Sequence, residues 1–313
     1  MRTKFSLILS LLCLPLAFWA CGNDSGGSAS DDDYSVVSDS ESSSSSSKDV
    51  IASSSSINVI ASSSAAKLSS SSVNSSDSGW SWDVPKEDRL NPEIEYGEMT
   101  DARDGKKYKT VEICNEDKSI CQTWMAENLN YADSVKTVSL KGKSWCYDNK
   151  DANCDVAGRL YTWAATIDSA ALANDAENPQ TCGYRVECTL PATVQGICPD
   201  GWHLPSYEEW QTLFTAVGGS SNAGKALKSG FGWYSNGYGT DAYGFSALPA
   251  GYRNDNGYFD CAGDIAYFWS ASQFQYEDYS YGAYDMDLGY YGDTAYLNYD
   301  GKYFGLSVRC LKD

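Results

Sequence analysis

Eleven cysteines constrain this chain of 313 residues more than any other feature, because nine of them fall between residues 114 and 310. Cysteines at this density form disulfides in oxidising compartments and are rare in the reducing cytosol. None of the nine has the Cys-x2-Cys spacing that is typical of zinc sites, so metal ligation by these sulfurs is disfavoured. The sequence therefore predicts an exported domain that is stapled by disulfides.

The N-terminus resembles an export signal. Two basic residues precede a largely apolar run over residues 5–19, which is too short to span a bilayer comfortably and is typical of a signal peptide. The run ends in Ala20-Cys21-Gly22, which resembles the bacterial lipobox, whose cysteine is lipidated and becomes the mature N-terminus. Ordinary cleavage beside an incidental cysteine is the alternative. We predict a signal peptide over residues 1–20 and lipidation at Cys21, where two or more acyl chains would anchor the protein in a membrane.

A serine-rich segment follows the predicted lipidation site. Serine makes up 23 of the 44 residues from 35 to 78, and a six-residue phrase that starts at Val50 returns at Val59. Such a segment buries too little apolar surface to offset the entropy of ordering its backbone. We therefore expect residues 21–79 to form a lipidated, flexible tether. The acidic cluster at residues 31–33 is either an export signal like that of some surface lipoproteins or a solvated charge run.

The net charge of −19 excludes one class of partner. After residue 80 the chain has 34 acidic and 19 basic residues, so most of the negative charge belongs to the region that we expect to fold. A surface of this sign repels phosphates, so the sequence predicts no nucleic-acid partner. Aromatic residues make up 13% of the chain, which is enough for a sizeable core.

An ordered α+β domain is expected after the tether. We predict a transition segment over residues 80–97 and one domain over residues 98–313, with two main helices, short antiparallel strands and long loops. Residues 110–114 and 120–124 alternate in polarity around a turn-like sequence, which predicts a hairpin. Residues 306–311 also alternate and predict a closing strand.

Two helices and one long irregular region complete the prediction. The clearer helix begins after Ser206, which can form a capping box with Glu209, and it ends at Gly218-Gly219. Its apolar face is formed by Trp210, Leu213, Phe214 and Val217. The second helix is expected over residues 160–173. Its inward positions would be Leu160, Trp163, Ala164 and Ile167. Residues 231–304, rich in Gly, Tyr, Asp and Asn, are expected to form extended loops on a small core.

Six motifs follow one another in order along the predicted domain. They are WMAENLNY at 124–131, GRLYTWAA at 158–165, CPDGWHLPS at 198–206, YGFSALPAGYR at 243–253, FWSAS at 268–272 and GLSVRCL at 305–311. This succession resembles the Fibrobacter succinogenes major paralogous domain over roughly residues 98–313. That family is similar to the C-type-lectin-like superfamily, especially the branch of formylglycine-generating enzymes. The resemblance implies a C-type-lectin-like fold in a cell-surface module, often behind a lipoprotein signal, and it implies no activity.

Nine cysteines remain for disulfides once Cys13 is assigned to the signal peptide and Cys21 to the lipid. We predict four pairs, although the sequence alone permits many others: Cys114 with Cys121, Cys146 with Cys154, Cys182 with Cys188, and Cys198 with Cys310. Cys261 is left unassigned by this scheme and could be buried or pair between chains.

Catalysis finds little support in the residues. His203 is the only histidine and could act as a base beside Ser206, but its position before a helix cap favours hydrogen bonding to the backbone. The formylglycine-generating branch uses a pair of cysteines near the C-terminus, and the contexts of Cys261 and Cys310 do not reproduce it. We therefore lean against an enzyme.

Acidic residues raise two further possibilities. Asp285 with Asp287, or Glu277 with Asp278, could serve a glycosidase, but we interpret them as solvated loop charges. The chain lacks the Glu-Pro-Asn loop of calcium-dependent lectins, so the usual sugar–calcium site is absent. Residues 254–257 could hold a structural calcium ion, with a plain turn as the alternative. We predict no cofactor and no metal ligand.

Tyrosines give the strongest functional signal. Nine of them crowd residues 276–303, where a flat ring with a hydroxyl suits stacking on sugars or contacts with proteins. Alternatively, about half of these rings fill the domain's own core. The candidate ligand-binding residues are Tyr279, Tyr281, Tyr290 and Tyr291.

The sequence thus predicts an extracytoplasmic lipoprotein at the outer membrane or cell surface. We expect it to present a non-catalytic binding or adhesion module for polysaccharide or a surface protein. The alternatives are a structural protein of the cell envelope and a secreted enzyme of the formylglycine-generating type.

Overall fold

The structure is a computed structural model, and it describes residues 79–275 and 281–313. The chain divides into two units, residues 1–75 and 76–313, and every described residue belongs to the second. The predicted signal peptide, the lipidation site Cys21 and almost all of the serine-rich tether lie outside the described residues, as do Glu277, Asp278 and Tyr279.

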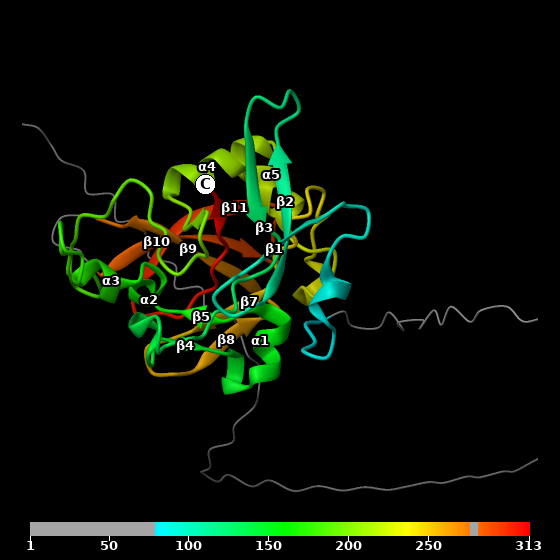
Figure 1. Cartoon of the computed structure of the whole chain (residues 1–313). Helices are drawn as coiled ribbons and strands as arrows, with labels where there is room; N and C mark the ends of the chain where they lie inside the picture. The colour runs from blue at the N-terminus through cyan, green and yellow to red at the C-terminus, as the bar shows by residue number, and fades with distance from the viewer. Residues whose placement is uncertain (1–78, 276–280) are drawn as a thin grey trace, which may run out of the picture. The chain divides into compact units, whose positions relative to one another are not determined.

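Two antiparallel sheets form the framework of the domain (Figure 1). The larger has the order β1-β2-β3-β12-β6, with β1 (Gly97–Thr100), β2 (Lys107–Cys114), β3 (Cys121–Met125), β12 (Leu311–Lys312) and β6 (Trp202–His203). The other has the order β11-β10-β9, with β9 (Ile265–Gln273), β10 (Gly282–Gly289) and β11 (Ala295–Gly301). Two short pairs join β4 (Ser144–Trp145) to β5 (Leu160–Tyr161) and β7 (Ala250–Arg253) to β8 (Phe259–Ala262).

Short helices connect these strands, and α4 packs against both sheets through β2, β9, β10 and β11. The α-helices are α1 (Asp151–Ala157), α2 (Trp163–Thr166), α3 (Ser169–Ala173), α4 (Tyr207–Ala216) and α5 (Ser220–Leu227). The 3-10 helices are η1 (Lys86–Arg89), η2 (Val138–Leu140), η3 (Tyr147–Asn149) and η4 (Tyr234–Asn236). Among the described residues, no helix is long and apolar enough to cross a bilayer.

The predicted hairpin and capped helix are confirmed. In the hairpin, Cys114 lies opposite Cys121, and the β2–β3 pair projects from the body of the domain in Figure 1. In α4, the Ser206 side chain accepts from the Glu209 N–H, and the Glu209 side chain accepts from the Ser206 N–H, which completes the capping box. The four predicted apolar positions of α4 are all buried: Trp210, Leu213, Phe214 and Val217.

The helix predicted over residues 160–173 is wrong as a single element. It begins as strand β5 and then forms α2 and α3, which are separated because Asp168 adopts a left-handed conformation with φ of 50°. The Asp168 carboxylate caps α3 by accepting from the Ala171 N–H. A carboxylate that hydrogen-bonds to nearby backbone competes with the helix, and this splits the segment. Ala165 is buried, whereas the predicted inward residue Ala164 is only half-buried.

The loops predicted over residues 231–304 are also wrong, because this region holds five strands, β7 to β11. Along β10, Ala283, Asp285 and Asp287 share one face, while Met286 and Leu288 point to the core on the other. Both faces of β10 are covered, so its aspartates are buried. In a strand with one face in solvent, the same polar positions would be exposed. The region is rich in Gly, Tyr, Asp and Asn, a composition typical of loops, but its backbone forms regular strands.

The closing strand over residues 306–311 is only partly correct. Only Leu311 of this stretch lies in a strand, β12, and the segment before it makes single bridges from Leu306 to Tyr161 and from Ser307 to Phe268. All six residues are buried, including Arg309. Alternating polarity predicts a strand with one face in solvent. Here the whole segment is buried, and it bridges to β5 and β9, so both of its faces are covered.

All four predicted disulfides are present. The bonds join Cys114 to Cys121, Cys146 to Cys154, Cys182 to Cys188, and Cys198 to Cys310. Cys261 is buried, as one of its two predicted alternatives holds. Because disulfides of this number persist in oxidising compartments, they indicate an extracytoplasmic location.

Two aromatic-rich clusters form the core, and Arg309 lies between them. Trp124 stacks on Trp210 at 4.6 Å between ring centroids in the first cluster, and Trp163 and Trp269 are fully buried in the second. Arg309 donates from Nε to the Asn128 side chain at 2.8 Å. Its other nitrogens donate to the backbone carbonyls of Met125, Phe245 and Ser246.

Candidate binding face and cavity

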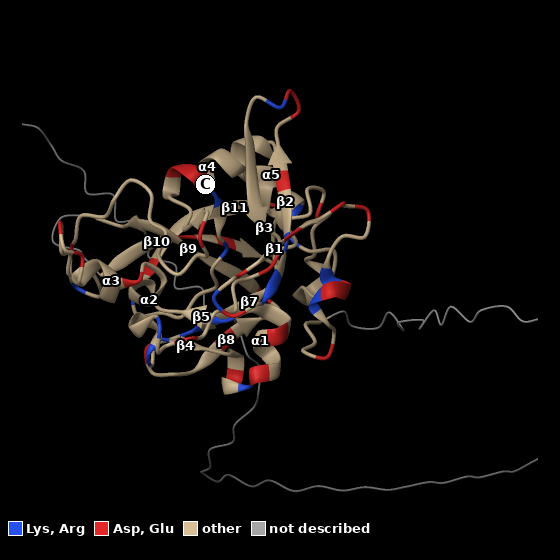
Figure 2. Ribbon diagram, viewed as in Figure 1, with Lys and Arg blue, Asp and Glu red and all other residues tan. Residues whose placement is uncertain are grey.

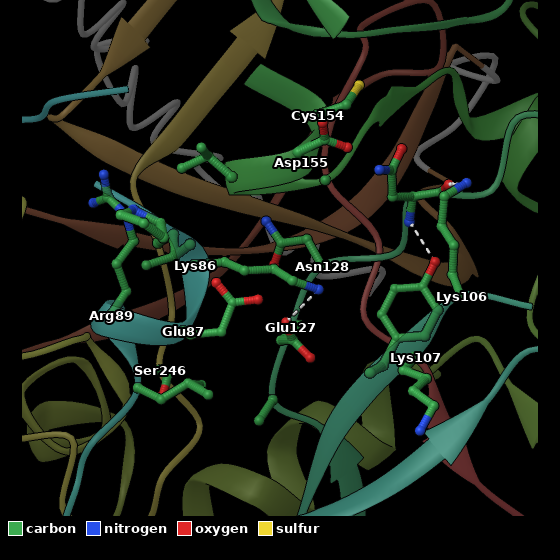
Figure 3. Close-up of a pocket in the computed structure, with 18 residues that line it drawn as sticks. Lys86, Glu87, Arg89, Lys106, Lys107, Glu127, Asn128, Cys154, Asp155 and Ser246 are labelled. Carbon is green, nitrogen blue, oxygen red and sulfur yellow. Dashed lines mark hydrogen bonds and ion pairs between the residues drawn. The ribbon is translucent and has the colours of Figure 1, made fainter. Parts of the chain in front are cut away.

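A cavity of about 360 Å³ lies beside η1, between the start of β2, the segment after β3, and α1 (Figure 3). It is the default place to look for a ligand, because ligands bind preferentially in concave sites. The polar and charged residues that line it include Lys86, Glu87, Arg89, Lys106, Lys107, Glu127, Asn128 and Asp155.

The inner polar groups of this cavity already have partners. Lys86 Nζ lies 2.8 Å from Glu127 Oε1, and the other Glu127 oxygen accepts from the Lys109 N–H. Asn128 donates to the Ala157 carbonyl and accepts from Arg309. Among the described residues, the buried side-chain atoms without a partner all lie elsewhere. We therefore interpret the cavity as a gap left where residues 85–90, which precede β1, pack against the rest of the domain.

Buried aspartates on the β9–β10–β11 sheet are a stronger candidate. Acidic residues are spread over several elements, including α1 and β2, so surface charge alone does not mark a site (Figure 2). Burial does. Asp285 is 1% exposed and Asp287 is 8% exposed, so our interpretation of these two as solvated loop charges is wrong. Asp300 on β11 is half-buried beside them.

Burial raises the pKa values of all three carboxyls, and the charge of Asp300 raises those of Asp285 and Asp287 further. Burial first, then the charges of Asp300 and Asp287, raise the pKa of Asp285 well above its usual range. Burial is also the main cause that raises the pKa of Asp287 to about 7 and the pKa of Asp300 to about 6. Both carboxylate oxygens of Asp285 lack a hydrogen-bond partner.

Two exposed tyrosines lie next to Asp287 on the same face of the sheet. Tyr296 is its cross-strand partner on β11, and directly opposite residues share a face. The Tyr291 ring lies over Gly289, where an added Cβ would come within 2.5 Å of it. Each of the two tyrosines is 48% exposed. We call Asp285, Asp287, Asp300, Tyr291, Tyr296 and Asn298 the tyrosine–aspartate face.

The predicted ligand-binding tyrosines do not form one platform. Tyr290 and Tyr291 are adjacent, with ring centroids 5.4 Å apart, but Tyr290 packs against the core and against Tyr234. Tyr281 precedes the opposite end of β10, roughly 25 Å along an eight-residue strand, and contacts Tyr184. Of the described candidates, only Tyr291 belongs to the tyrosine–aspartate face.

The His203 ring contacts two carboxylates. The predicted hydrogen bonding of this ring to the backbone is wrong. Nε2 lies 2.9 Å from Glu209 Oε1, and Nδ1 lies 2.7 Å from Asp313 Oδ1. The hydrogen bond to Glu209 is the largest cause that raises the pKa of His203, and the bond to Asp313 adds to it. Ser206 is committed to the cap of α4. This arrangement fastens the start of α4 to the C-terminus.

The described residues contain one group with metal-like spacing, Glu112 with Cys114 and Cys121. Its two sulfurs are joined in a disulfide and so cannot act as thiolate ligands. The acidic loop at residues 254–257 is the tight turn between β7 and β8, where the Asn254 side chain accepts from the Tyr258 N–H. Its polar groups serve the turn.

Sequence reasoning missed Asp300 and the burial of its neighbours. The available signal was the alternation Tyr284-Asp-Met-Asp-Leu288, in which aspartates occupy every second position of an otherwise apolar run. Period-two alternation predicts a strand. The surrounding tyrosines and glycines favoured a loop, and that interpretation hid the signal.

These observations define a disulfide-stapled α+β domain that buries an acidic cluster beneath exposed tyrosines on one sheet. The Fibrobacter succinogenes major domain matches residues 120–312, which is more than half of the chain, and the protein belongs to that family. Comparisons with curated proteins and with solved structures give no match. Strands β1 and β2 precede the matched region, yet they complete its larger sheet.

Proposed function

We propose that this protein is a non-catalytic binding module of the cell surface and that it binds polysaccharide through the tyrosine–aspartate face. One observation carries the proposal: the exposed rings of Tyr291 and Tyr296 both lie next to the Asp287 carboxylate. Aromatic rings stack on the apolar faces of sugars, and a carboxylate accepts hydrogen bonds from sugar hydroxyls.

Polysaccharide is favoured over a protein ligand by the charge of this face. The cores of protein interfaces are depleted in aspartate and other charged residues. Here Asp287, which is 8% exposed, lies beside both exposed rings, and a protein partner would have to close off the remaining edge of a carboxyl that has no basic partner among the groups that act on it. A polysaccharide is rich in hydroxyl groups, which can donate hydrogen bonds to the carboxyl. Its binding therefore does not leave that group buried without a partner.

The expected result of removing the two exposed rings is a loss of binding without a loss of fold. Truncation of aromatic anchors in binding sites often costs about 2 kcal/mol or more each, so Tyr291→Ala with Tyr296→Ala should weaken binding more than tenfold. The matched control is Tyr258→Ala, because Tyr258 is 72% exposed but lies on the turn between β7 and β8. Retention of the full chain, in detergent, on insoluble cellulose and on a glycan array measures the effect.

Two results would contradict this proposal. Equal retention of the double variant and the Tyr258→Ala control would remove the tyrosine–aspartate face from the binding site. A large fall in melting temperature of the double variant would show that the rings stabilise the fold, since exposed side chains contribute little stability.

We also propose that Cys21 carries lipid and tethers the domain through the serine-rich segment. The apolar run followed by Ala20-Cys21-Gly22 supports this, together with the extracytoplasmic location that the disulfides indicate. Cys21→Ala should move the protein from the detergent phase to the aqueous phase, or leave its signal uncleaved. Identical detergent partitioning and processing of the two forms would contradict a lipid anchor.

The fold proposal is that the domain is C-type-lectin-like. Its support is the bond from Cys198, just before β6 and the capped helix α4, to Cys310, just before the last strand β12. A compact loop-rich domain closed by its own final strand is the arrangement that the sequence resemblance implies.

A further inference from the structure

Asp285 is the least accommodated side chain among the described residues. It is 1% exposed, and neither of its carboxylate oxygens has a hydrogen-bond partner. The other buried atoms without a partner are single nitrogens of Trp80, Trp210 and Arg253. Burying an ionised carboxylate without a partner is costly, so an unsatisfied carboxylate points to a charge-compensating group.

Two more carboxylates converge on the same place. Asp285 and Asp287 alternate along β10 and therefore share a face. Asp300 on β11 pairs with Ala283, two residues before Asp285, which makes it a diagonal neighbour on that face. All three carboxylates act on the hydroxyl of Tyr267, the cross-strand partner of Asp287 on β9.

Within residues 79–275 and 281–313, no basic side chain compensates this cluster. The groups that act on the three carboxyls are one another and the amide of Asn298, and no lysine or arginine is among them. Asn298 lies opposite Asp285 on β11 and is exposed, so its side-chain carbonyl can add a neutral oxygen.

We propose that Asp285, Asp287 and Asp300 bind a divalent cation of the calcium type. The available ligands are carboxylate and amide oxygens, which suit hard cations, and Ca²⁺ tolerates irregular geometry better than Mg²⁺ does. The three carboxylates are not all within 4.8 Å of one another, as expected for like charges without an ion between them. A bound ion would draw them inward, and water would complete its coordination. This inference goes beyond the proposed function and does not depend on it.

Calcium binding can be tested on the full chain in detergent after treatment with EDTA. We expect titration calorimetry to give one Ca²⁺ per chain. At about a hundredfold excess over Kd, the melting temperature should rise by roughly 5–10 °C. Asp285→Asn keeps the shape but removes the charge, so it should abolish both responses. In EDTA this variant should melt no lower than the parent protein, because it replaces a buried carboxyl that has no hydrogen-bond partner with a side chain of the same shape.

The matched control is Asp255→Asn, in the acidic turn between β7 and β8, which should respond to Ca²⁺ like the parent protein. If Asp285→Asn does not fold, the half-buried Asp300→Asn should show the same loss of response. A parent protein that does not respond to Ca²⁺ would overturn the proposal. So would an equal melting shift with NaCl at matched ionic strength, or a normal Ca²⁺ response in the folded Asp285→Asn or Asp300→Asn variant.

Discussion

Replacing Cys198 and Cys310 with alanine should lower the free energy of unfolding by about 4–5 kcal/mol, the largest loss that we expect from any single change of covalent structure. The two cysteines are 112 positions apart, and a crosslink over a longer loop removes more entropy from the unfolded chain. Both are fully buried in the second core cluster, so the loss of packing adds to the effect. Denaturant unfolding followed by tryptophan fluorescence measures it.

The matched control is the pair Cys114→Ala with Cys121→Ala. This bond closes a loop over only seven positions at the end of a projecting hairpin, so about 2.5 kcal/mol is expected from its removal. Equal losses for the two double variants would contradict the argument from loop length. A smaller loss for the Cys198–Cys310 pair would show that the native sheet holds the ends together without the bond.

Arg309→Met should destabilise the domain by about 3–5 kcal/mol, because removing one member of a buried polar network leaves the others without partners. Arg309 is fully buried, and burial lowers its pKa to about 9. Its guanidinium lies 4.5 Å from the Phe245 ring and holds carbonyls from segments far apart in the chain. Methionine fills a similar volume but donates no hydrogen bond. Thermal and denaturant unfolding should both show the loss.

Arg185→Met is the control for that experiment. Arg185 is exposed and contacts the Tyr184 ring at 5.1 Å from its centroid, so its replacement should cost within about 1 kcal/mol. If Arg309→Met were as mild as this control, the buried hydrogen bonds would contribute specificity and not stability. That outcome is known for some buried ionic groups.

The features that could be predicted from the sequence depend on local signals. The capping box of α4 needs only Ser206 and Glu209, and the β2–β3 hairpin needs only alternation around a turn. The three short disulfides followed from cysteines that are near each other in sequence. The long bond from Cys198 to Cys310 was also predicted, because both cysteines fall in conspicuous motifs.

The features that were missed depend on contacts between distant segments. The burial of Asp285 depends on its neighbours β9 and β11, and neither pairing is visible in the pattern around Asp285 itself. Likewise, the helix predicted over residues 160–173 was split by the conformation of Asp168, although the apolar spacing continued through it. Periodicity reports which face is apolar, but it does not report that both faces of a strand are covered.

The order of the cysteines along the chain has a consequence for biosynthesis. Three bonds join cysteines that are consecutive in the chain, whereas Cys261 lies between the partners Cys198 and Cys310. If thiols were oxidised in the order in which they emerge during export, Cys198 would therefore pair first with Cys261 and not with Cys310. Correct pairing then requires thiol–disulfide exchange after Cys310 has been translocated. Because β12 enters the larger sheet between β3 and β6, this sheet cannot be completed until β12 has been translocated.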